Sequence, residues 1–285
     1  MPSGISKTAF LQYLLADNRD GSGKATSYVR ALELLEEMLK IRDFGFGDCV
    51  AIWSVDSLER LEALRILVSE QTRQWETSQW NRKEFPKSYL RDGYCRAALR
   101  AYQEFLLENA HERELRQIVD DPKTKQDEMG KILNRRVNIP DFLLEDYAHQ
   151  EGKTVRRSVE TRVNQNIFRR IILEIYENRC CVTGLDIPTV NRASHILPWT
   201  PYPEYRMDPR NGLCLSATYD AAFDQHLISL DDDYCLILSK DLKEHYTSSS
   251  VQTWFRDKEG AQIALPSRFH PKKHFLETHR QSGRF

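Results

Sequence analysis

The segment that decides the fold lies between residues 180 and 230. It carries four short motifs in order: CCVTG (180–184), ASHILPW (193–199), DPRNGLCL (208–215) and YDAAFD (219–224). Apolar runs at 193–197 and 213–215 predict two short strands, and Ser216 is placed to cap a helix that runs through about Phe223. Two further runs, 227–230 and 234–238, flank three consecutive aspartates and predict a hairpin. Upstream, residues 165–178 have the apolar spacing of an amphipathic helix.

Three side chains of these motifs could take a proton from water or hold a metal ion. His195 lies in a short apolar strand, and an imidazole with a pKa near its usual value of about 6.5 accepts a proton from water at neutral pH. Asp220 and Asp224 stand four residues apart, so a helix would project both carboxylates from one face. Such like charges repel unless a cation lies between them, and hard carboxylate ligands favour Mg²⁺ or Mn²⁺.

The ordered set of motifs resembles the HNH (ββα-metal) nuclease family, in the form found in bacterial restriction-type endonucleases. The resemblance covers about residues 156–245 and implies an α+β fold with a ββα-metal domain. It implies that His195 is the general base and that Asp220 binds the metal ion at the last motif element. It places Asp224 where some members, the colicin nucleases among them, have a further ligand. It also implies that the Asn211 side chain ties the loop to the ββ turn and holds the base in place.

Each of these residues also has a plain structural interpretation. His195 could be a buried structural histidine, Asn211 part of an Asn-Gly turn, and the two aspartates a solvated helix face. Ser194 stands where many HNH enzymes have an Asp or His that binds the metal, and a neutral hydroxyl is a poor ligand for Mg²⁺. This departure keeps open a second hypothesis, a non-catalytic DNA-binding or interaction protein with a degenerate ββα module. An enzyme that acts on RNA or on single strands is a third.

His226 is a second departure, because it stands where a glycine would be more usual. It could approach the phosphate, but a surface position is the favoured interpretation.

Basic residues around the motifs are candidate phosphate contacts, with a solvated helix face as the alternative. Four precede the first motif and two lie in the loop before the second strand: Arg156, Arg157, Arg169, Arg170, Arg206 and Arg210. The net charge of the chain is −1, so a nucleic-acid surface must be a local patch. DNA, with the double-stranded form favoured, is the partner that the resemblance implies.

The cysteines argue against a structural zinc ion, because the six of them form no CxxC pair. We expect Cys181 and Cys214 to fill the core, and so few cysteines predict a reducing, cytoplasmic compartment. No apolar run approaches the roughly 18 residues of a membrane helix, so no membrane association is expected.

The first half of the chain shows no catalytic motif. Periodic apolar residues between 29 and 39 predict a helix, a second is expected from Ser88 to Asn109, and Val50, Ile52 and Trp53 predict a short strand. With a boundary in the polar stretch near residue 150, the chain divides into a mainly helical domain, 1–150, for target recognition or assembly, and a nuclease domain, 151–285. A symmetric DNA target would favour a homodimer, since each protomer would have one active site. The sequence thus predicts a metal-dependent HNH endonuclease in a bacterial restriction or defence setting.

Overall fold

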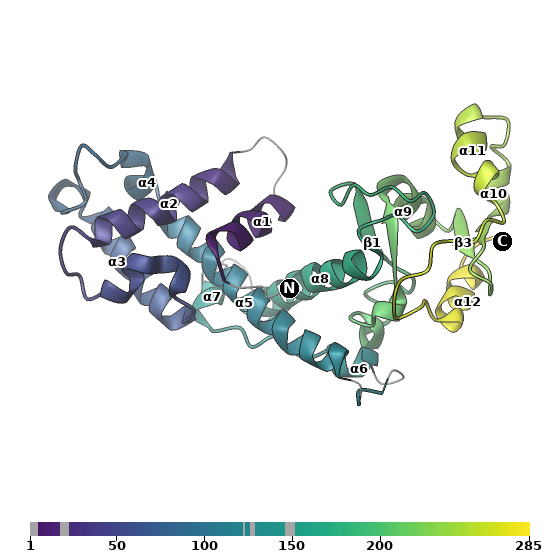
Figure 1. The fold of residues 1–285 in the computed structure, drawn as a ribbon, viewed down its shortest axis with the longest axis horizontal. Coiled ribbons are helices and arrows are strands. Elements are labelled where there is room, and N and C mark those ends of the chain that lie inside the picture. The colour runs from purple at the N-terminus through teal and green to yellow at the C-terminus, as the bar shows by residue number, and fades with distance from the viewer. Residues whose placement is uncertain (1–4, 18–22, 122, 126–128, 146–151) are drawn as a thin grey trace. The chain divides into compact units, whose positions relative to one another are not determined.

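The computed structural model describes residues 5–17, 23–121, 123–125, 129–145 and 152–285 (Figure 1). It divides into an N-terminal unit, residues 1–114 with 139–146, and a C-terminal unit, residues 115–138 with 147–285. Residues 115–138, which the sequence assigns to the first domain, pack with the C-terminal unit. The boundary predicted near residue 150 lies outside the described residues. Within the described ranges, no helix is both long and apolar enough to cross a bilayer.

The N-terminal unit is built from helices around one apolar core. They are α1 (Lys7–Asp17), α2 (Lys24–Leu39), α3 (Leu58–Arg73), α4 (Lys87–Arg91), α5 (Tyr94–Asp120, up to Glu114 in this unit) and α7 (Phe142–Glu145), with the 3-10 turns η1 (Gly47–Ser54) and η2 (Trp75–Thr77). The apolar positions of α2 that the sequence places on one face are all buried. The predicted helical character of this region is therefore confirmed.

Two local predictions in this unit are wrong. Residues 50–53 form part of η1 instead of a strand. The buried residues are Cys49 and Ile52, which are three positions apart, and side chains at this spacing lie on the same side of a 3-10 helix. The helix expected from Ser88 to Asn109 is broken into α4 and α5. Gly93 lies between them with φ +85°, a left-handed conformation that ends a helix.

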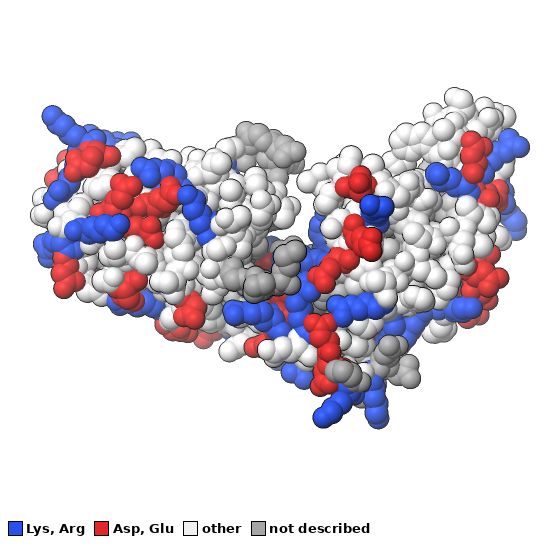
Figure 2. Space-filling model, viewed as in Figure 1, with Lys and Arg blue, Asp and Glu red and all other residues white. Residues whose placement is uncertain are grey.

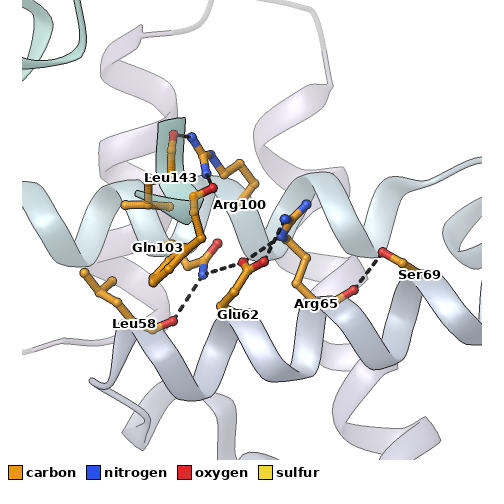
Figure 3. A network of polar contacts seen from close by, with 8 residues as sticks. Leu58, Glu62, Arg65, Ser69, Arg100, Gln103 and Leu143 are labelled. Carbon is orange, nitrogen blue, oxygen red and sulfur yellow. Dashed lines mark hydrogen bonds and ion pairs between the residues drawn. The ribbon is translucent and has the colours of Figure 1, made fainter. Parts of the chain in front are cut away.

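A polar network joins α3 to α5 inside this unit (Figure 3). Glu62 forms a two-pronged ion pair with Arg65, at 2.7 and 2.8 Å, and accepts a hydrogen bond from Gln103 Nε2 at 3.3 Å. The same nitrogen donates to the Leu58 carbonyl at 3.2 Å, and Arg100 donates to the Leu143 carbonyl. Over the visible face of the unit, acidic and basic side chains are intermixed (Figure 2). That face therefore offers no broad surface of one charge sign for a phosphate backbone.

The C-terminal unit holds the predicted strands and helix in the expected order. β1 (Asn191–His195) pairs antiparallel with β2 (Gly212–Ser216), His195 opposite Gly212, and α9 (Ala217–Asp224) follows directly. A second antiparallel pair, β3 (Ile228–Leu230) and β4 (Leu236–Leu238), is the predicted hairpin. With the helical first unit, this arrangement confirms the α+β class. The remaining elements are α6 (Met129–Leu133), α8 (Gly152–Ile175), η4 (Pro203–Tyr205), η5 (Pro209–Asn211), α10 (Lys240–Lys243), α11 (Ser249–Trp254), η6 (Arg256–Lys258) and α12 (Lys273–Gln281).

The long helix α8 lies against β1 and β2 (Figure 1) and positions the start of the second strand. A Cβ atom added at Gly212 would lie 2.4 Å from Ile172 Cδ1 and 2.8 Å from Phe168 Cζ. Only glycine permits this approach of strand to helix. The approach matters for the site because Phe168 also contacts His195.

Candidate active site

A cleft of about 570 Å³ opens in the C-terminal unit between α8, β1 and α9. Its lining includes three of the side chains that the sequence singled out for catalysis or metal binding: His195, Asp220 and Asp224. Residues that are 29 positions apart in the chain therefore face one cavity, because the β1–β2 turn brings β1 beside α9.

One ring nitrogen of His195 is hydrogen-bonded, and the other is available to accept a proton. Its ring stacks on Phe168, with centroids 3.9 Å apart and planes 12° from parallel, and meets the edge of Trp199 at 5.2 Å. Nε2 lies 3.0 Å from the Arg206 carbonyl oxygen, which can only accept, so Nε2 carries the hydrogen and Nδ1 has the lone pair. Burial lowers the pKa of His195 to about 4, although the carbonyl contact opposes the shift. The ring is therefore a neutral proton acceptor at physiological pH.

Asn211 fixes the loop that carries the Arg206 carbonyl. Its Oδ1 accepts from the Leu197 amide at 2.8 Å, and its Nδ2 donates to the carbonyls of Leu197 and Tyr205 at 3.1 and 3.2 Å. The side chain is completely buried, so it does not reach a substrate. Asn211 therefore holds the loop that places the Arg206 carbonyl beside His195.

The two aspartates lie on α9, whose N-cap is Ser216, although the serine side chain makes no capping hydrogen bond. Ser194 Oγ donates to Asp220 Oδ1, which fixes that carboxylate at the cleft. Burial and, next, the charge of Asp220 raise the pKa of Asp224. Two carboxylates with an unfavourable mutual charge suit a divalent cation, so the residues present fit one. Within the described ranges, no third His, Cys, Asp or Glu completes a cluster with them, so water and phosphate oxygens would fill the other positions.

One family model matches the chain, over residues 180–231, and its description is HNH endonuclease. This segment is therefore similar to HNH endonuclease domains. The match begins at the cysteine pair and ends after β3, so it contains the strands, α9 and the motifs that carry the site. No curated protein matches the chain. The family expectation for this segment is confirmed, and nucleases of this family generally use divalent metal ions.

The predicted phosphate contacts differ in their placement around the HNH domain. Arg169 lines the cleft, and its guanidinium donates to the carbonyls of Asn191 and Pro188 at 2.7 and 2.8 Å. Arg206 donates to the Trp199 carbonyl, and its guanidinium lies over the Trp199 ring, 5.4 Å from the centroid. Burial lowers the pKa of Arg206, and the charge of nearby Arg157 lowers it further. Arg156 and Arg170 are half-buried on α8, and neither lines the cleft.

Arg210 is not available to a substrate, contrary to the sequence-based expectation. Its guanidinium pairs with Asp208 at 2.7 and 2.8 Å, with side-chain exposures of 7% for the arginine and 1% for the aspartate. Asp208 is the N-cap of η5 and Arg210 lies within it, directly before Asn211. Lys272 Nζ approaches the Asp208 carboxylate at 3.8 Å. Arg210 therefore supports the turn that presents Asn211.

Removing the carboxylate of this pair should destabilise the domain strongly. We expect Asp208→Ala to lower the free energy of unfolding by about 3–5 kcal/mol, because a buried guanidinium is left without its counter-ion. Urea denaturation measures the change. Glu277→Ala is the matched control, since Glu277 pairs with His274 at the surface, where their side chains are 57% and 79% exposed, and it should leave the midpoint unchanged. An Asp208→Ala midpoint equal to that of the wild type would contradict the assignment.

Three buried cysteines lie close together, and one of them, Cys214, belongs to β2. The amide of Cys181 donates to the Cys214 carbonyl at 2.8 Å, and Cys180 is close enough to both thiols to affect their pKa. Burial raises the pKa of Cys214 to about 12 and that of Cys181 well above its usual value, which favours the neutral thiol over the thiolate that zinc requires. We still expect the purified protein to hold no tightly bound zinc.

Sequence reasoning missed two features of the site. It treated Ser194 only as an absent ligand, whereas the hydroxyl orients Asp220. It also gave no role to Trp199, which packs between His195 and Arg206. Neither contact has a signal in residue spacing, because both depend on how the loop after β1 folds back.

Proposed function

We propose that this protein is a metal-dependent endonuclease that hydrolyses DNA phosphodiester bonds. The observation that carries the proposal is that His195, whose Nδ1 is left to accept a proton, lines the same cleft as Asp220 and Asp224. A base and a paired carboxylate site are the two parts that metal-assisted hydrolysis of a phosphodiester requires.

The side chains would share the work as follows. His195 Nδ1 accepts a proton from water, while the Arg206 carbonyl holds the ring in the required tautomer. Asp220 and Asp224 would hold Mg²⁺ or Mn²⁺, with Ser194 orienting the first carboxylate. When bound, the ion would neutralise charge on the phosphate and the leaving oxygen. Arg157, Arg169 and Arg206 would contact the DNA backbone near the cleft, and Arg156 and Arg170 farther along α8.

The setting that we propose is bacterial restriction or defence. The family match leaves the first 179 residues without a nuclease assignment, and a nuclease of this kind needs a means of choosing its target. We propose that residues 1–150 recognise the target or mediate assembly, with a homodimer as the form suited to a symmetric site.

A plasmid assay tests the activity. Supercoiled DNA should be nicked or linearised with Mg²⁺ or Mn²⁺ and left intact with EDTA. Plasmids with and without modified cytosines, assayed in parallel, would show whether base modification directs cleavage, and a labelled RNA would show whether DNA is preferred. Retardation of DNA on a gel without cleavage in either metal would identify a non-catalytic binder and contradict the proposal.

A further inference from the structure

His226 occupies a backbone position that favours glycine. It follows α9 with φ +52°, and two hydrogen bonds close the end of the helix: the His226 amide to the Phe223 carbonyl and the Leu227 amide to the Ala222 carbonyl, both 2.9 Å. This is a Schellman motif, whose left-handed residue is usually glycine because any Cβ is disfavoured there. The backbone alone therefore gives no reason for an imidazole at this position.

The His226 ring also contributes little polar bonding to the fold. Across the part of the chain that the structure describes, neither ring nitrogen has a hydrogen-bond partner, and Nδ1 is buried in that state. The nearby His279 shows what a structural histidine in this domain looks like. Its Nδ1 pairs with Ser229 Oγ at 2.9 Å, its Nε2 lies 3.1 Å from the Phe223 carbonyl, and its ring stacks on Phe223 at 3.8 Å.

The His226 ring lies beside the metal-binding carboxylates. It lines the same cleft as Asp220 and Asp224, two positions after the latter, and packs against His279 with centroids 4.5 Å apart. Because Nδ1 is buried without a partner, Nε2 is the ring nitrogen left to bind a ligand. An imidazole nitrogen with no partner among the described residues thus belongs to a side chain that lines the cleft.

We propose that His226 is a substrate-binding residue whose Nε2–H donates a hydrogen bond to a phosphate oxygen of the strand in the cleft. The inference rests on the proposed nuclease function and adds a residue to it. Phosphate oxygens are the acceptors that such a substrate would bring beside two carboxylates, which repel a phosphate unless a cation and a donor offset them. A conformationally disfavoured side chain kept at a functional cleft fits this role.

The test compares two substitutions that suit the left-handed backbone equally well. Gly removes the donor, whereas Asn tolerates positive φ and keeps an N–H group. We expect His226→Gly to lower kcat/KM roughly 10- to 100-fold at saturating Mg²⁺, as for the loss of a hydrogen bond to a charged group. The melting temperature of His226→Gly should not fall, and His226→Asn should retain most of the activity. His274→Ala, at an exposed histidine of the same unit, is the control and should match the wild type.

DNA binding provides a second test, which does not depend on cleavage. The affinity for a DNA duplex should fall by a similar factor when His226→Gly is added to His195→Ala. If the wild-type protein cuts no DNA, the proposed function fails and this binding test alone decides the role of His226. Unchanged kcat/KM and affinity in His226→Gly would overturn the inference. A loss of both activity and melting temperature in His226→Gly and His226→Asn would also overturn it, because that result indicates a packing role. A raised Mg²⁺ requirement would overturn it as well, because that result indicates a metal ligand.

Discussion

Replacing His195 by Ala should lower kcat by about 10²- to 10⁴-fold while DNA affinity stays within a few-fold of the wild type. The imidazole would take the proton from water, and general-base catalysis contributes a factor of this size. Its removal leaves both aspartates and the arginines of α8 in place, so metal and DNA should still bind. The variant should therefore retard DNA on a gel without cutting it, which single-turnover cleavage and gel retardation together would measure.

His245→Ala is the matched control for this experiment, because His245 is exposed and lies away from the cleft. It should cleave at the wild-type rate. Wild-type cleavage by His195→Ala would instead assign His195 a structural role and leave the base to be sought elsewhere in the cleft.

The pH profile provides a second measurement of the same residue. The sequence alone indicates a pKa near 6.5, whereas burial against Phe168 lowers the pKa of His195 to about 4. A base must be deprotonated to act, so its contribution to the rate should be constant above about pH 5 and be lost as the pH falls through 4. His279 has the same depressed pKa of about 4. Both groups bind protons more readily when unfolded, so stability should be lost as the pH falls from about 6.5 to 4, and the rate is to be measured where the fold persists.

The central part of the fold could be predicted because it is encoded locally. β1, β2 and α9 each follow from a short motif with its own turn residues, and the pairing of β1 with β2 brings His195 near Asp220. The spacing of Asp220 and Asp224 places them on one face of a helix wherever that helix packs. These predictions needed little knowledge of the rest of the chain.

The remaining features depend on tertiary packing, which spacing does not reveal. Arg210 looks like a phosphate contact from its loop position, and it is buried because Asp208 lies two residues earlier in a turn that directs both side chains inward. The Ser194 hydroxyl reaches Asp220 only once the strand and helix are adjacent. The long helix α8 begins at Gly152, well before the predicted start at residue 165, since Val155, Val159 and Val163 are also buried.

Replacing Asp220 by Asn should abolish metal-dependent cleavage, with a loss of roughly 10³-fold or more. The amide keeps an oxygen that can accept from Ser194 Oγ, so the local geometry is retained while the negative charge is removed. Charge stabilisation by a bound divalent ion is worth several kcal/mol, which corresponds to a loss of this size. Asp224→Asn should be milder and should recover at high metal concentration, because Asp224 is the more exposed residue and would share the ion with Asp220.

Thermal melts distinguish metal binding by Asp220 and Asp224 from a general effect of the substitutions. A ligand that binds the folded state raises its stability by RT ln(1 + [L]/Kd), so Mg²⁺ should raise the melting temperature of the wild type. It should not raise that of the Asp220→Asn, Asp224→Asn double variant, whereas Asp257→Asn, at an exposed carboxylate outside the cleft, should respond like the wild type. Because Asp220 is part of what raises the pKa of Asp224, removing its charge should also bring that pKa back toward its ordinary value in the metal-free protein. Equal stabilisation of all three proteins by Mg²⁺ would place the ion elsewhere and leave the two aspartates as an acidic helix face.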